Sequence, residues 1–184
     1  MKQPDVVNVL AISGSLRSVS SNTALITAAT RLAPVGVQVS VFQGLAAIPP
    51  FNPDINTDDL SSAVLELRSA LDASDAVLIS SPEYAHGVSG VLKNALDWVV
   101  GSGELIDKPI ALINASSRAT HAHASLVETL TTMSARVIPG ASITIPLDGT
   151  SLNADGIVND NQLSALLRSA LDVLTRSTRT SLIG

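Results

Sequence analysis

A short polar segment near the N-terminus carries the groups that anion binding needs. The segment 13–22 reads SGSLRSVSSN, and the residues after it have the apolar spacing of a helix. The N–H groups at the start of a helix are unpaired and carry partial positive charge, and hydroxyl groups add donors. Arg17 adds a forked cation that suits a phosphate, and Gly14 permits a tight turn close to a ligand. A serine-rich helix cap would explain the serines but not Arg17, so the segment predicts a phosphate site.

Two common phosphate-binding motifs are absent from the sequence. The dinucleotide motif Gly-x-Gly-x-x-Gly needs three glycines, and the segment offers only Gly14. The P-loop needs Gly-Lys followed by Ser or Thr, which occurs nowhere in the chain. A mononucleotide with a terminal phosphate is therefore the favoured ligand.

A second polar segment contains the only tyrosine of the chain, Tyr84. Its ring can stack on or border a planar ligand. Pro82 fixes the backbone before it, so that the N–H groups of Glu83 and Tyr84 can bind the polar edge of that ligand. The alternative is a proline-initiated turn with a surface tyrosine. His86 follows closely, and its role stays open between binding a second substrate, binding a phosphate and no function.

The elements that position these segments alternate between apolar runs and amphipathic stretches. We expect strands at Val6–Ile12, Val37–Val41, Asp75–Ile79, Pro109–Asn114 and, interrupted, Val137–Ile145, with helices at Thr23–Leu32, Asp58–Ala73, Val91–Val100, Ala124–Arg136 and Asn161–Arg176. This alternation predicts an α/β fold with a five-stranded parallel sheet covered by helices on both faces. The commonest order for such a sheet is 2-1-3-4-5. The loops after strands 1, 3 and 4 then lie at one edge, where ligands bind.

Composition narrows the class of protein. The length of 184 residues predicts one domain over 1–184. A hydrophobic content of 46% with 15% charged residues and a mean hydropathy of +0.37 excludes intrinsic disorder. The net charge of −5 leaves no basic face for a nucleic acid. Because cysteine is absent, disulfides, thiolate nucleophiles and iron–sulfur clusters are excluded.

The sequence also bears on location and assembly. The N-terminus lacks the pattern of a signal peptide, and no apolar stretch reaches the length of a membrane span, so we expect a cytoplasmic protein. The high apolar content with few charges favours burial between subunits. We expect a dimer.

Two motifs together resemble a known family. The order Gly-Ser-Leu-Arg-x-x-Ser-x-Asn at 14–22 is followed at 82–98 by Pro-Glu-Tyr, a glycine and Leu-Lys-Asn-Ala-Leu-Asp-Trp. This pattern resembles the NADPH-dependent FMN reductase family, which has a flavodoxin-like fold, a three-layer sandwich. The family includes proteins described as quinone, chromate and azo-dye reductases. The likeness covers the chain from about Val6 to Leu147.

The resemblance implies roles for the polar segments. The FMN phosphate would be held by residues of the first loop: Ser15, Arg17, Ser20, Ser21 and Asn22. Pro82, Glu83 and Tyr84 would lie at the flavin ring. Many family members have Asn at the position of Ala85, so a side-chain contact to the flavin is missing there. The helix with Lys93, Asn94, Asp97 and Trp98 would serve packing or a dimer contact. The resemblance also implies that the protein forms a homodimer or homotetramer.

The third loop differs from the family pattern. The family usually has glycines where this chain has Ser116, Ser117 and Arg118. These side chains can still donate to the flavin carbonyls, which would stabilise negative charge on the reduced ring. His121 and His123 do not predict a metal site, because residues two apart face away from each other on a helix and no third ligand is near.

The activity implied by the resemblance is FMN-dependent oxidation of NADPH, with NADH as a possible substitute. A small acceptor such as a quinone, azo compound, free flavin or metal oxyanion would then take the electrons. Both substrates would use one open face of the flavin in turn, which predicts ping-pong kinetics. The cofactor performs the chemistry, so we assign no catalytic residue. The alternatives are a flavodoxin-type electron carrier without its own NAD(P)H oxidation, and a flavin-free scaffold.

Overall fold

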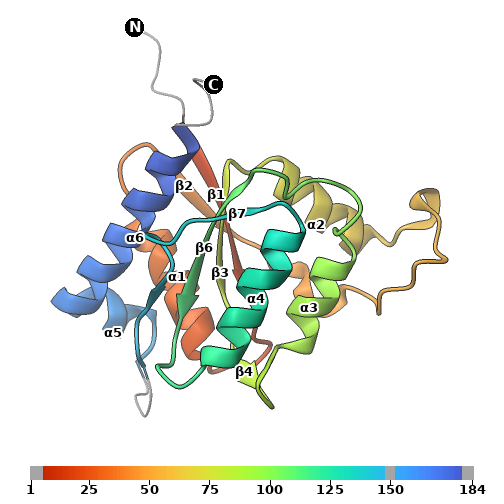
Figure 1. Ribbon diagram of the computed structural model, residues 1–184. Coiled ribbons are helices and arrows are strands. Elements are labelled where there is room, and N and C mark those ends of the chain that lie inside the picture. The colour runs from red at the N-terminus through yellow and green to blue at the C-terminus, as the bar shows by residue number, and fades with distance from the viewer. Residues whose placement is uncertain (1–5, 148–151, 180–184) are drawn as a thin grey trace, which may run out of the picture.

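The computed structural model describes residues 6–147 and 152–179. A parallel sheet runs through its centre in the order β2-β1-β3-β6 (Figure 1). Two short strands, β7 and β8, share the last position, and each of them pairs with β6. The predicted order 2-1-3-4-5 is therefore confirmed, with the last strand in two pieces. The strands are β1 (Val7–Ser13), β2 (Val37–Val41), β3 (Ala76–Ser80), β6 (Pro109–Asn114), β7 (Arg136–Val137) and β8 (Ile143–Thr144).

The interruption of the last strand has a local cause. Pro139 has no N–H to give to a sheet, and Ile138 O instead accepts the N–H groups of Ala141 and Ser142 in a turn. Strand β7 pairs with the start of β6 and β8 with its end. Between them the N–H of Leu112 donates to Ser142 Oγ at 3.1 Å. The hydroxyl thus replaces the missing strand bond.

Helices cover both faces of the sheet, as predicted. One layer holds α1 (Ser21–Leu32), α5 (Ala154–Asn159) and α6 (Asn161–Arg179), and the other holds α2 (Ser62–Asp72), α3 (Gly90–Asp97) and α4 (Thr120–Thr132) (Figure 1). Short 3-10 turns lie at Gly44–Ala47 and Thr57–Asp59. Within the described residues no helix is long and apolar enough to cross a membrane.

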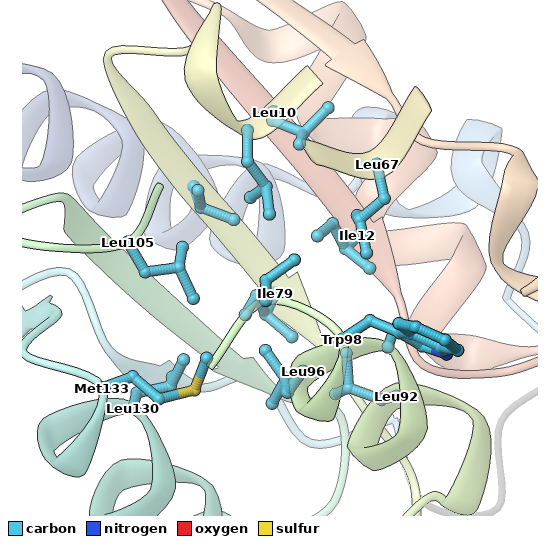
Figure 2. Packing of buried hydrophobic residues seen from close by; sticks show 14 of the residues in the cluster. Leu10, Ile12, Leu67, Ile79, Leu92, Leu96, Trp98, Leu105, Leu130 and Met133 are labelled. Atoms are coloured by element: carbon cyan, nitrogen blue, oxygen red, sulfur yellow. The ribbon is translucent and has the colours of Figure 1, made fainter. Parts of the chain in front are cut away.

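Successive residues of the central strands feed two separate cores. Leu10 and Ile12 of β1 pack toward α2, α3 and α4, while Val9 and Ala11 pack toward α1 and α6. Figure 2 shows the first of these cores, with Ile79 of β3 at its centre. The strands are apolar on both faces because helices bury both.

Several element boundaries differ from the prediction, and serine caps explain two of them. Helix α1 begins at Ser21, not at residue 23, because the Ser20 hydroxyl accepts the N–H of Thr23. Helix α2 begins at Ser62, not at residue 58, because Ser61 caps it through the N–H of Val64. Helix α5 was not predicted.

The helix α3 fixes the long loop that follows β2. Asn94 Nδ2 and Trp98 Nε1 both donate to Pro49 O, at 2.9 and 2.8 Å. The ring of Phe51 meets the ring of Trp98 edge to face, with centroids 5.2 Å apart. These contacts give Asn94 and Trp98 a packing role within the chain. A dimer contact by this helix stays a prediction.

An ion pair between α2 and the segment before β6 predicts pH-dependent stability. Burial alone would raise the pKa of Glu104, but hydrogen bonds from Ser102 and Arg68 outweigh it and lower that pKa below its ordinary value. The stabilisation is therefore present above the ordinary pKa and lost as the pH falls through the lowered one. We expect Glu104→Gln to lower the free energy of unfolding by about 1 kcal/mol at pH 7.

Urea denaturation at neutral and at acidic pH measures this effect. The gap between the wild type and Glu104→Gln should close as the pH falls. The control is Glu66→Gln, on the exposed side of α2. An equal gap at both pH values would show that the carboxylate charge does not contribute.

Candidate functional site

The loops after β1 and β3 touch at the carboxyl edge of the sheet. The N–H of Gly14 donates to Ser80 O at 2.8 Å, and Ser80 Oγ donates to Asn22 Oδ1 at 2.9 Å in a buried position. A Cβ on Gly14 would lie 2.5 Å from Ser81 Oγ and 3.1 Å from Ser81 Cα. Glycine at this position therefore serves a close approach between two loops.

The loop after β1 is ordered by its own serines. The Ser15 N–H donates to Ser13 Oγ at 3.3 Å, and the Arg17 N–H donates to Ser15 Oγ at 3.4 Å. Ser15 is buried, whereas Arg17 is exposed. Among the described residues no hydrogen bond or ion pair of the Arg17 guanidinium is found. The loop thus presents a cation beside the N-terminus of α1.

The segment after β3 forms a small hairpin. Strands β4 (Glu83–Tyr84) and β5 (Gly87–Val88) pair antiparallel. The carboxylate of Glu83 accepts the N–H of Ala122 in the first turn of α4 at 2.8 Å. No side chain of the residue before α4 caps that helix, so Glu83 supplies the cap from the hairpin. Tyr84 is 53% exposed.

The loop after β6 is shaped by Asn114, the last residue of that strand. Its Oδ1 accepts the N–H of Ser116 at 3.1 Å, and its Nδ2 donates to Ala119 O at 3.0 Å. The Ser116 hydroxyl in turn accepts the N–H of Arg118 at 3.2 Å. Side-chain hydrogen bonds thus hold this loop in place, at positions where the family that the sequence resembles usually has glycines.

Residues of the three predicted loops border an open cavity of about 510 Å³. Such a volume is typical of small-molecule and cofactor sites. Its walls come from the start of α1, the hairpin, the loop after β6 and the segment after β8. The lining residues are Ser21, Asn22, Ser81, Pro82, Glu83, His86, Asn114, Ala115, Ser116, Arg118, Ala119 and Leu147.

The residues predicted for the cofactor divide into two groups. Those that line the cavity are Ser21, Asn22, Pro82, Glu83, Ser116 and Arg118. Those that lie on the same loops without lining it are Ser15, Arg17, Ser20, Tyr84 and Ser117. The structure therefore brings the three predicted loops together, although part of each loop does not line the cavity.

Several lining residues were not singled out in the sequence. Asn114 is the last residue of one predicted strand, and Ser81 lies two residues after the end of another, so strand topology alone could have pointed to both. Ala115, Ala119 and Leu147 are apolar and carry no signal of chemistry. They line the cavity because the loop after β6 continues into α4 and the Leu147 N–H donates to Ala115 O at 2.9 Å.

The two histidines of α4, His121 and His123, have different neighbours. The rings of His121 and His86 stack with centroids 4.3 Å apart and an interplanar angle of 6°. His123 lies instead beside a separate, smaller hollow. In the part of the chain that the structure describes, no group of three or more His, Cys, Asp or Glu residues is arranged to hold a metal ion.

Comparisons with known proteins agree with this geometry. Residues 7–149 match the family model of the NADPH-dependent FMN reductases. The NAD(P)H-dependent FMN reductase of Pseudomonas aeruginosa is 32% identical over 175 residues, covering 92% of this chain and 94% of the relative. The quinone reductase of Escherichia coli is 34% identical over 106 residues, covering 57% of this chain and 55% of the relative.

The fold has a solved counterpart in FerB, a flavoenzyme NAD(P)H:(acceptor) oxidoreductase from Paracoccus denitrificans. The two structures superpose with a TM-score of 0.76 at 26% identity, over 95% of this chain and 98% of that one. The family match covers both predicted motifs and all three loops of the cavity. This chain therefore belongs to the NADPH-dependent FMN reductase family.

Proposed function

We propose that this protein is an FMN-dependent NAD(P)H oxidoreductase that reduces small acceptors such as flavins and quinones. The observation that carries the proposal is a polar cavity of about 510 Å³ at the carboxyl edge of the sheet, in a chain that matches the FMN reductase family over residues 7–149. The polar groups fit FMN. The loop after β1 carries Arg17 and several hydroxyls and leads into Ser21 and Asn22, which line the cavity, and the other two loops offer backbone amides.

The loop after β1 would hold the FMN phosphate. The first turn of α1 offers unpaired N–H groups, and Ser21 and Asn22 line the cavity there. The side-chain oxygen of Asn22 accepts a hydrogen bond from the Ser80 hydroxyl. The side-chain NH2 group of Asn22 is therefore the part that can donate to a ligand. Ser15, Arg17 and Ser20 would complete the phosphate site from the rim.

The hairpin and the loop after β6 would hold the flavin ring. The Glu83 carboxylate caps α4, so the contribution of Glu83 to the ligand is its backbone, with Pro82 and Tyr84 beside it. Ser116, Ser117 and Arg118 would donate to the polar edge of the ring from the other side. Tyr84 is 53% exposed and follows the lining residue Glu83 directly, and its ring would border the flavin.

The mechanism requires binding and orientation by the protein and no acid or base from it. When bound, FMN would supply the hydride and electron transfer between NAD(P)H and an acceptor. The donors of the loop after β6 would stabilise negative charge on the reduced ring in a site that excludes part of the solvent. NAD(P)H and the acceptor would occupy the open side of the cavity in turn.

We extend the proposal to the assembly and location of the protein. We infer a homodimer or homotetramer in the cytoplasm. Its assembly is supported by the apolar composition and by exposed apolar side chains in the segment after α3, where Val100 is 56% and Ile106 58% exposed. A neighbouring subunit that covers these side chains would remove them from water.

Cofactor analysis and steady-state kinetics test the proposed function. The purified protein should release FMN on denaturation, and it should oxidise NADPH or NADH with flavins and quinones as acceptors. Double-reciprocal plots at several acceptor concentrations should be parallel, because the two substrates bind in turn. Release of FAD alone, or intersecting plots with an isolable complex of both substrates, would contradict the proposal.

A further inference from the structure

The hairpin beside the cavity has an unfavourable turn. The pairs Glu83–Val88 and Tyr84–Gly87 leave Ala85 and His86 as a two-residue loop. Both have positive φ, 48° for Ala85 and 59° for His86. Hairpin turns of this kind favour Asn and Gly, because side chains with a Cβ clash in the left-handed region. Contacts outside the turn must therefore hold it in place.

Two contacts to α4 supply that support. At the base of the hairpin, Glu83 accepts the N–H of Ala122 at 2.8 Å. At its tip, the ring of His86 stacks on that of His121, with centroids 4.3 Å apart and planes within 6° of parallel. Figure 1 shows β4 next to the N-terminal end of α4. The hairpin is thus fastened to the helix at both ends.

The same hairpin forms one wall of the cavity. Pro82, Glu83 and His86 line the cavity from the hairpin, and Ser116 and Arg118 line it from the loop that leads into α4. A contact between the hairpin tip and the first turn of α4 therefore sets how far apart these walls stand.

We propose that His121 is a positioning residue for the flavin ring, acting through His86. The stacked pair holds the strained hairpin at the separation that a planar ring needs. Without the stack, the turn can relax and the binding-competent hairpin is populated for only a fraction of the time, which weakens apparent affinity by that fraction. This inference rests on the proposed function, because it takes FMN as the ligand of the cavity.

The expected effect follows from the strength of an aromatic pair. Loss of one such contact changes an equilibrium by about 2- to 10-fold. His121→Ala should weaken the binding of FMN and of riboflavin by the same factor in this range, because the two ligands have the same flavin ring. His121→Phe keeps a flat ring that can stack, so it should restore affinity close to that of the wild type.

Fluorescence titration of the flavin-free full-length protein with FMN and riboflavin measures these affinities, and thermal unfolding checks that each variant is folded. His123→Ala is the matched control, since His123 lies on the same helix outside the stacked pair. Ala85→Gly in the His121→Ala background removes the clash in the turn without adding a side chain. It should recover part of the lost affinity.

The outcomes separate the alternatives. Unchanged flavin affinity in a folded His121→Ala protein would overturn the proposal. Equal weakening in His121→Ala and His121→Phe would also overturn it, since the imidazole would then act by hydrogen bonding and not by stacking. A wild-type protein that binds no flavin would instead contradict the proposed function, so the two failures are distinguishable.

Discussion

Replacing Arg17 with alanine is expected to weaken FMN binding about 10- to 100-fold, which corresponds to a charge-assisted contact of about 1.5–3 kcal/mol. The reason is that Arg17 places an exposed cation beside the N-terminus of α1, where the phosphate is proposed to sit. Riboflavin lacks the phosphate, so its affinity should stay unchanged. Titration of the wild type and the variant with both ligands measures the difference.

The matched control for Arg17 is Arg31→Ala, which removes a cation from the other end of the same helix. Arg31 pairs with Asp155 on α5, away from the cavity. Its loss should leave both affinities unchanged. Equal weakening of FMN and riboflavin by Arg17→Ala would show that Arg17 supports the fold and does not bind the phosphate.

Replacing Gly14 with alanine should impair both the fold and the site. The new Cβ would lie within 2.8 Å of Ser81 Cβ and within 3.1 Å of its backbone Cα, so the loops after β1 and β3 must separate. Overpacking of this kind costs about 1–3 kcal/mol of unfolding free energy. Because the Gly14–Ser80 hydrogen bond joins the same loops, we also expect FMN and riboflavin to bind at least about 10-fold more weakly.

Gly101→Ala is the control for that substitution. Its Cβ would meet no atom within 4 Å, and its φ is not left-handed. Chemical denaturation and flavin titration of both variants measure the two effects. Wild-type affinity in Gly14→Ala would mean that the spacing of the two loops is not required for the ligand.

The sheet and the carboxyl edge where the cavity lies could be predicted, because short stretches of the sequence are enough to indicate each strand and the loop that follows it. Strands buried on both faces read as short apolar runs. Strands β3 and β6 are buried along their whole length, and only their last residues, Ser80 and Asn114, are polar. Right-handed crossovers and the alternation with helices then leave few strand orders. The sequence therefore predicts that the loops at 13–22, 80–90 and 115–123 meet, and residues of all three border one open cavity.

The remaining features depend on contacts between segments far apart in the sequence. The carboxylate of Glu83 could be predicted as polar and near the site, but not as the cap of α4, because Ala122 lies 39 residues away. The stacking of His86 on His121 has the same origin. The split of the last strand was visible in part, since Pro139 interrupts the apolar run.

Anaerobic mixing of the FMN-loaded protein with NADPH tests the central claim most directly. The account predicts that the visible absorbance of the flavin bleaches with no other protein present. It also predicts that a quinone restores the absorbance after the oxidised nucleotide has been removed. A flavin that stays oxidised until a separate reductase is added would contradict the account and would indicate a flavodoxin-type electron carrier.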